Sequence, residues 1–340
     1  MEIKEIFIRN FKSIGEIFLE DISPLMALVG PNGSGKSNFV DALKFIGLVQ
    51  KYGLANVLED ENNDFYPDNI KNFNLTTAED NHIFFAFSVL DEQKKLQKFT
   101  YSLDLLNLLE SIMGKELVEW ARKNNEREYR KIIANTKVFR IDPFVIKNRS
   151  SLNTNPDSLN ESGSNIAAVL EKLEQDNELR EEIIDWLALI VPELENIEIS
   201  SNRLDGSKGL VFQEKSGQQF PAHMISDGTI YALCMLVAVL TRTKEPGITI
   251  IEEPERGLHP QAIEELIGFM RKKASLEHPI ILTTHSESVV RALELNELYL
   301  VSKENGATKI RSVKNTTVDK RKIPLDTAWL NNLFNGGLPW

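Results

Sequence analysis

One segment near the N-terminus has residue types and spacing suited to holding a nucleoside triphosphate. Gly30-Pro-Asn-Gly33-Ser-Gly35-Lys36-Ser37 matches the pattern G-x-x-x-x-G-K-[ST]. Glycines let backbone N–H groups turn toward phosphate oxygens, a lysine here neutralises the β- and γ-phosphates, and the serine hydroxyl can ligate Mg²⁺. We therefore expect nucleotide contacts from Asn32, Gly33, Ser34, Gly35, Lys36, Ser37 and Asn38.

Two adjacent carboxylates, Glu252 and Glu253, follow the apolar run at 248–251. Neighbouring side chains on a strand point to opposite sides. Glu252 can then face the water shell of the metal while Glu253 orients the attacking water as a general base. Two acids after a strand are usually a solvated strand end, but beside the phosphate loop we interpret Glu252 as metal-binding and Glu253 as catalytic.

The hydrophobic pattern indicates which elements place these residues. An apolar strand at 25–29 leads into the loop, and helical spacing at 37–49 follows it, so the loop opens a helix. Further strands are expected near 3–8, 83–90 and 99–105, with a loop over 53–80. After residue 195 we expect strands near 197–200, 209–213, 248–252, 280–284 and 297–302, and helices near 227–242 and 260–274. This alternation predicts an α/β fold.

Composition excludes several classes of protein. The chain has 340 residues, 42% hydrophobic and 26% charged, which is typical of an ordinary globular protein rather than a disordered or disulfide-stapled one. A lone cysteine, Cys234, in the apolar run 230–240 is expected to be a buried thiol in a reducing compartment. That run has 11 residues, fewer than the roughly 18 needed to cross a bilayer, so we expect a cytoplasmic protein without membrane contact.

Charge is distributed unevenly. The net charge of −11 disfavours nucleic acid unless basic residues cluster. Residues 121–149 hold nine Lys and Arg against three acids, or +6, whereas residues 171–198 hold two bases against ten acids, or −8. The basic stretch could hold DNA phosphates and the acidic stretch a basic partner protein, but for each a solvated helix face is the simpler interpretation.

Five segments, taken in order, resemble the ABC/SMC-type ATPases, specifically the compact RecF-like and OLD-like members. They are Ile8–Ile14, the phosphate loop, Ile225-Ser-Asp-Gly-Thr229, Glu252-Glu-Pro-Glu-Arg-Gly-Leu-His-Pro260 and Thr283-Thr-His285-Ser286. The resemblance covers roughly the first 100 and last 140 residues. It implies a P-loop NTPase with an ABC/SMC-type head, a mixed sheet flanked by helices, that uses ATP and Mg²⁺.

The resemblance also assigns roles to residues outside the two motifs. Ser226 and Gly228 match the signature segment, which in such ATPases contacts the γ-phosphate held by the opposing subunit, so two chains would enclose two ATP molecules in a homodimer. A polar turn at the start of a helix is also a natural anion site in its own right, although an ordinary helix cap has the same residues. Gly257–His259 matches the segment that crosses the interface. His285 matches the switch histidine and is expected, with Lys36 and Glu253, among the catalytic residues.

Three features depart from the family pattern. Glu252 stands where an Asp is common, which adds a methylene and makes slow hydrolysis conceivable. The segment at 226–229 lacks the usual second glycine. The family glutamine that links the nucleotide to the coupling region has no convincing counterpart among Gln50, Gln93 and Gln97.

Spacing predicts an inserted region. Gly30 and Glu253 are more than 200 residues apart, far more than a minimal P-loop domain needs. We expect residues 1–104 and 196–340 to form the ATPase head and residues 105–195 to form an accessory, mostly helical lobe that determines specificity.

Three functions remain open. We favour an ATPase that dimerises around ATP and gates a DNA-related effector in anti-phage defence or DNA maintenance. The 55 residues after His285 are too few for the Toprim domain of OLD-type nucleases, so we expect a separate effector protein, a nuclease or toxin. A nucleotide-gated scaffold with little turnover is the alternative. A transporter ATPase subunit is less consistent with residues 7–11 and the missing glutamine.

Overall fold

The fold was determined as a computed structural model that describes residues 1–60, 65–70, 82–91, 93–104, 127–147, 155–201, 204 and 206–338. Its centre is a mixed sheet in which β3 (Leu25–Val29), β11 (Ile280–Thr284), β10 (Ile248–Glu252) and β6 (Thr136–Phe139) run parallel. β12 (Leu298–Glu304) pairs parallel with β3, and β13 (Ala307–Ser312) pairs antiparallel with β12. The strand order is β13-β12-β3-β11-β10-β6.

One face of this sheet packs on the N-terminal part of the chain. A second, antiparallel sheet has the order β2-β1-β4-β5, formed by β1 (Glu2–Phe11), β2 (Ile14–Leu19), β4 (His82–Leu90) and β5 (Leu96–Asp104). α1 (Lys36–Tyr52) buries Phe39, Leu43 and Ile46 against these strands and against Met26 and Leu28 of β3. Because side chains alternate along a strand, the remaining β3 residues point to the opposite face.

The opposite face of the central sheet carries a second core, which also extends under the lobe. It receives the other side chains of β3 and residues of α9 (Asp227–Arg242), α10 (Pro260–Lys273), α11 (Glu287–Ala292) and α12 (Leu325–Leu330). α9 is buried along nearly its whole length, including Cys234, as the apolar run predicted. Burial raises the pKa of this thiol above its usual range, so it stays protonated.

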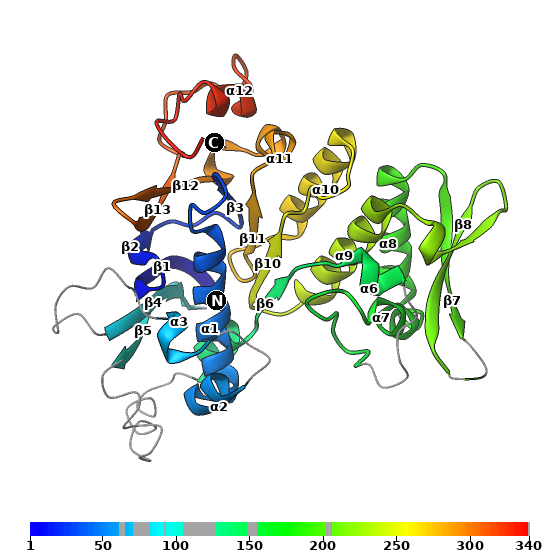
Figure 1. Ribbon diagram of the computed structural model, residues 1–340, viewed down its shortest axis with the longest axis horizontal. Coiled ribbons are helices and arrows are strands. Elements are labelled where there is room, and N and C mark those ends of the chain that lie inside the picture. Colours follow the sequence, from blue (N-terminus) through cyan, green and yellow to red (C-terminus); the bar gives the residue numbers. More distant parts are fainter. Residues whose placement is uncertain are drawn as a thin grey trace.

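The lobe lies to the right in Figure 1 and contains both helices and strands. It comprises α6 (Pro143–Lys147), α7 (Ile166–Leu173), α8 (Asn177–Ile190), and a separate antiparallel sheet of β7 (Leu194–Ser201), β8 (Lys208–Glu214) and β9 (Gln219–Pro221). We expected these strands and α9 to belong to the C-terminal half of the head, but β7 packs against α7 and α8, β8 packs against α7, and α9 packs against α8. The same core continues from the central sheet into the lobe.

The structure confirms the predicted fold class and differs from the expected elements in two places. Thr136–Phe139, placed in a mostly helical region, forms the edge strand β6, because Val138 and Phe139 are buried on opposite faces of the sheet. Within the expected loop at 53–80, α2 (Leu54–Glu59) and α3 (Pro67–Ile70) are helical. α5 (Arg127–Ala134) precedes β6, and residues 105–126 of the expected lobe lie outside the described part. None of the described helices could span a bilayer.

Candidate nucleotide site

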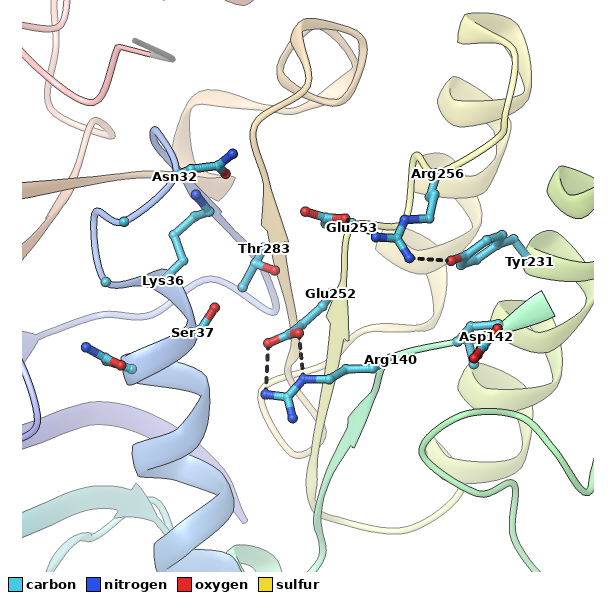
Figure 2. Close-up of a pocket in the computed structure, with 14 residues that line it drawn as sticks. Asn32, Lys36, Ser37, Arg140, Asp142, Tyr231, Glu252, Glu253, Arg256 and Thr283 are labelled. Atoms are coloured by element: carbon cyan, nitrogen blue, oxygen red, sulfur yellow. Dashed lines mark hydrogen bonds and ion pairs between the residues drawn. The ribbon is translucent and has the colours of Figure 1, made fainter. Parts of the chain in front are cut away.

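A cavity of about 550 Å³ opens where β3, β10 and β11 end, between α1 and the lobe. Its walls come from four parts of the chain: the phosphate loop with the start of α1, the ends of β10 and β11 with the residues after β10, the segment after β6, and Tyr231 of α9. Figure 2 shows Lys36 and Ser37 on one side, Glu252 and Glu253 in the centre, and Tyr231 and Arg256 toward the lobe. Its size is in the range of small-molecule binding sites.

The phosphate loop is held in place by residues distant in sequence. Gly35 has φ = 104° and lies against Thr308 so closely that a Cβ there would collide with the threonine side chain. The Thr308 hydroxyl donates to the Ser34 carbonyl (3.2 Å) and pairs with the Ser13 hydroxyl (2.6 Å). Asn38 in turn donates to Ser13 (2.5 Å). The loop is therefore preorganised by β13 and by the turn between β1 and β2.

The loop residues fit a phosphate group. The Ser34 hydroxyl is buried and makes no hydrogen bond within the described residues, and buried polar groups normally have partners. Lys36 Nζ lies across the loop and donates to the carbonyls of Gly30 (2.6 Å) and Pro31 (2.9 Å). Burial lowers the pKa of Lys36, an effect that nearby Glu253, Glu255 and Glu252 oppose.

The two predicted carboxylates lie opposite the loop but differ in their surroundings. Glu252 is the last residue of β10, whereas Glu253 has φ = 50°, a backbone conformation that non-glycine residues rarely adopt. A hydrogen bond from the Glu253 N–H to the Thr283 carbonyl (2.9 Å) holds this conformation. Such strain is often found at functional sites. Glu253 Oε1 lies 3.6 Å from His285 Nδ1.

Arginines contact both carboxylates. Arg140 donates to the two oxygens of Glu252 (2.6 and 3.3 Å), while Arg256 lies 3.2 Å from Glu253 and donates to the Tyr231 hydroxyl (3.0 Å). Burial by itself lowers the pKa of Arg140, but the bond to Glu252 and nearby Glu161 and Asp41 raise it above its usual range. The bond to Tyr231 likewise raises the pKa of Arg256. Both arginines are therefore fully charged in the site.

A third acid, Glu255, lies behind Glu253. Its Oε1 accepts from the Thr284 hydroxyl (2.6 Å), whereas its buried Oε2 has no hydrogen bond within the described residues. Burial raises the pKa of Glu255, partly offset by the Thr284 bond. The sequence analysis did not single out this residue.

The residues suit a metal that arrives with a nucleotide. Among the described residues, no group of three or more His, Cys, Asp or Glu side chains is close enough to hold a metal ion by itself. Mg²⁺ commonly uses one or two protein ligands together with substrate phosphates and water. Ser37 and Glu252 line the same cavity and would supply those protein contacts.

Ser226 and Gly228 of the predicted signature turn do not line this cavity. Ser226 is the N-cap of α9, and its hydroxyl accepts from the Thr229 N–H (3.2 Å) and pairs with the Thr229 hydroxyl (2.8 Å). Gly228 packs on the backbone of Gly257, where a Cβ would collide with the carbonyl oxygen. The signature and interface segments are thus in direct contact.

The cavity gathers some predicted residues and leaves others outside. Its lining includes Asn32, Gly33, Gly35, Lys36, Ser37, Asn38, Glu252 and Glu253. Four predicted residues do not line it: Ser34, Ser226, Gly228 and His285. Ser34 is a buried residue of the loop, Ser226 is exposed, and Gly228 is buried against Gly257.

Sequence reasoning missed Arg140, Asp142, Tyr231, Arg256 and Thr283, which also line the cavity. One sequence signal could have indicated Arg140. It is a charged residue directly after the apolar pair Val138-Phe139, just as Glu252 follows the apolar residues of β10. None of Gln50, Gln93 and Gln97 lines the cavity. Gln93 and Gln97 bond instead to Asp91 at the β4–β5 turn.

The basic stretch is not a single solvated face. Lys137 donates to Ser158 (3.0 Å), Arg140 enters the cavity, and Lys147 pairs with Asp227 (2.5 Å). Residues 121–126 and 148–149 of the stretch lie outside the described part. Several acids of the acidic stretch are also paired: Glu171 with Lys208, Asp176 with Lys244 and Glu182 with Lys273.

Known structures share this fold. The SMC head bound to the C-terminal winged-helix domain of ScpA aligns with a TM-score of 0.59 at 15% identity, covering 92% of this chain and 98% of that one. An SMC head with an extended coiled coil, bound to the C-terminal domain of ScpA from Pyrococcus furiosus, gives a TM-score of 0.54 at 14% identity, covering 91% and 96%. This similarity establishes the fold of an SMC-type head.

Sequence comparison gives the same assignment. An "ATP/GTP phosphatase" of Helicobacter pylori is 23% identical over 337 residues, 86% of this chain and 87% of that protein. A chromosome partition protein Smc of Methanocaldococcus jannaschii is 48% identical over only 44 residues, 13% of this chain and 4% of that protein. A family model described as "AAA domain, putative AbiEii toxin, Type IV TA system" matches residues 25–291. The chain belongs to this AAA domain family and is a P-loop ATPase of the ABC/SMC type.

Proposed function

We propose that the protein binds and hydrolyses ATP, and that two copies close around ATP to gate a separate effector. The observation that carries this proposal is the division of the site within one chain. The phosphate loop, Glu252 and Glu253 meet at one cavity, whereas the Ser226 turn lies outside it. A second copy would supply that turn.

Each residue of the cavity has a chemical task in this scheme. Lys36 and the loop amides bind the β- and γ-phosphates, and Ser37 with Glu252 would hold Mg²⁺, which supplies charge neutralisation of the phosphates. Glu253 accepts the proton of the attacking water at a carboxylate oxygen, and His285, 3.6 Å away, orients that carboxylate and the γ-phosphate.

The Glu253→Gln variant tests this scheme. Removing the base while keeping the shape should slow ATP hydrolysis by roughly two to four orders of magnitude. The variant should therefore accumulate an ATP-bound dimer, visible by light scattering after size exclusion, that the wild type forms only transiently. Unchanged steady-state turnover would show that Glu253 is not the base.

One observation favours a second candidate, a nucleotide-gated scaffold with little turnover. Both carboxylates needed for hydrolysis are bonded to arginines, Arg140 and Arg256. Such pairs hold the carboxylates in place but also reduce their capacity to act on water or a metal. ATP-dependent dimerisation of the wild type without measurable phosphate release would support the scaffold over the ATPase.

The effector is proposed to be another protein, a nuclease or toxin, in anti-phage defence or DNA maintenance. The family description names a toxin of a toxin–antitoxin system, which supports a role of this type. The structural relatives are SMC heads bound to ScpA, which supports a protein partner at the head. Capture on the Glu253→Gln protein with ATP, compared with capture without ATP, tests for a nucleotide-dependent partner.

DNA is a further proposed partner, through the basic residues on and near α5. Neutralising Arg127, Arg130 and Lys131 together should weaken DNA binding and flatten its salt dependence, because fewer counterions are released. If the wild type shows no DNA binding at low salt, with or without ATP, the proposal fails.

A further inference from the structure

Arg140 connects three parts of the molecule at the edge of the cavity. Its guanidinium contacts Glu252 at the end of β10 (2.6 and 3.3 Å), Asp41 on α1 (3.1 Å) and Glu161 in the loop before α7 (3.0 Å). Three carboxylates thus share one cation. Figure 2 shows the guanidinium directly beside the Glu252 carboxylate.

The backbone around Arg140 is tied to the lobe as well. The Arg140 N–H donates to the Glu161 carbonyl and the Asp142 N–H to the Ser162 carbonyl, both at 2.9 Å. The loop containing Glu161 is itself braced by fully buried Asn165, whose side chain bonds to Asn155, Ser158 and Asn160. α7 begins at the next residue. Arg140 is therefore linked by hydrogen bonds, through this loop, to the residue that precedes α7.

Two cations would compete for the Glu252 carboxylate: the Arg140 guanidinium and Mg²⁺. Both of its oxygens accept hydrogen bonds from Arg140, yet Glu252 is the carboxylate that would face Mg²⁺. A guanidinium and a divalent cation repel each other, and each attracts the same carboxylate. Arg140 can give up part of its contact with Glu252 and stay paired, because Asp41 and Glu161 remain within hydrogen-bond distance.

We propose that Arg140 is a positioning residue that competes with the metal for Glu252. Binding of metal and nucleotide then changes the contact through which Arg140 links Glu252 to the lobe. This inference rests on the proposed function. Through its bonds to Glu252 and Glu161, Arg140 fixes the long Glu252 side chain and ties β10 to the loop before α7. With the metal bound, Arg140 stays with α1 and Glu161, and the tie to β10 weakens.

The test measures ATP binding by calorimetry with Mg²⁺ and with EDTA, in the Glu253→Gln protein so that no hydrolysis occurs. We call the ratio of the ATP affinity with Mg²⁺ to the ATP affinity with EDTA the metal factor. Arg140→Gln should increase this factor about threefold to tenfold, because the competing cation is gone. Arg140→Lys keeps the charge without the paired donors and should give an intermediate factor.

Lys44→Gln is the matched control. Lys44 bonds to Glu161 (2.7 Å), so this change removes one positive charge from the same network but no bond to Glu252. It should leave the metal factor unchanged. Adding Glu252→Gln to Arg140→Gln should abolish the increase, because the carboxylate for which the cations compete is absent.

Hydrogen exchange provides a readout of the lobe. Amides in residues 160–166 should exchange at a different rate with Mg²⁺ and ATP than with ATP and EDTA in the parent protein, and this difference should be lost in Arg140→Gln. A metal factor that is unchanged or reduced in Arg140→Gln overturns the inference. Absence of ATP binding to the parent protein under both conditions would instead overturn the proposed function.

Discussion

The phosphate loop and the Ser226 turn differ in how much of their hydrogen-bonding capacity is already used. In the loop, the Ser34 hydroxyl is buried without a partner among the described residues. In the turn, the Ser226 hydroxyl both caps α9 and pairs with Thr229. The Ser34 hydroxyl therefore has unused hydrogen-bonding capacity among the described residues, whereas the Ser226 hydroxyl stabilises its own helix.

The two regions also differ in what surrounds them. The loop faces carboxylates and arginines across a cavity within the same chain. Ser226 lies outside that cavity, and the following Asp227 is paired with Lys147. One chain therefore gathers the loop and the two carboxylates at one cavity, and our proposal assigns the Ser226 turn to the cavity of a second copy.

The largest expected effect comes from the loop. Lys36→Ala removes the ammonium that faces the phosphates and should abolish ATP binding measured by calorimetry. Among the described residues, this lysine makes hydrogen bonds only to loop carbonyls, so the protein should stay folded by circular dichroism. Retained ATP binding would contradict the assignment of the loop.

The second-largest expected effect comes from the charge of residue 226, which two variants separate from its role as the N-cap of α9. Ser226→Asp and Ser226→Asn both preserve an N-cap, since Asp and Asn cap helices as well as Ser. Asp places a negative charge toward the partner's γ-phosphate, so ATP-dependent dimerisation should weaken by about two orders of magnitude relative to Asn. ATP binding by the single chain should be the same in both variants. Equal dimerisation of the two variants would argue against a phosphate at this turn.

A smaller effect concerns Glu255. Burial raises its pKa above that of the unfolded chain, so folding carries a cost at pH values above the folded pKa, and this cost vanishes as pH falls below about 4.5. Glu255→Gln should therefore stabilise the protein at pH 8 and should stabilise it less at pH 5. Thermal unfolding at both pH values measures this. A gain independent of pH would mean that the carboxylate charge is not its source.

The smallest effect compares the two serines directly. Ser226→Ala loses a helix cap and should lower the free energy of unfolding by about 1 kcal/mol. Ser34→Ala removes an unpaired buried hydroxyl and should leave stability unchanged or slightly higher. Urea titration without nucleotide checks both. A larger loss for Ser34→Ala would show that its hydroxyl already has a partner.

The sequence predicted those parts of the site that depend on local patterns. The phosphate loop, the Glu252–Glu253 pair and the helix after Ser226 each combine a recognisable motif with the period of the adjacent element. The fold class followed from the same alternation of strands and helices. The polar turn at Ser226 by itself indicates an anion site. Family resemblance supplied its assignment to the phosphate of another subunit and the interpretation of His285.

The remaining residues could not be predicted because their partners are distant in sequence. Arg140 meets residues that lie 21, 99 and 112 positions away. Its strand, β6, has four residues, too few for a period to be recognised. The same holds for Arg256 and Tyr231, which are 25 positions apart. Which distant residues meet depends on the tertiary fold, and no local sequence pattern indicates it.

Complementation of two inactive variants tests the central claim most directly. Lys36→Ala lacks a working loop and Ser226→Asp lacks a working turn, so each alone should be inactive. In a mixed dimer, the loop of the Ser226→Asp chain meets the turn of the Lys36→Ala chain, and one intact site forms. Equal mixing should restore up to about a quarter of the wild-type ATPase rate, because about half of the dimers are mixed and each has one of two sites. A mixture no more active than its components would contradict a site shared between two chains.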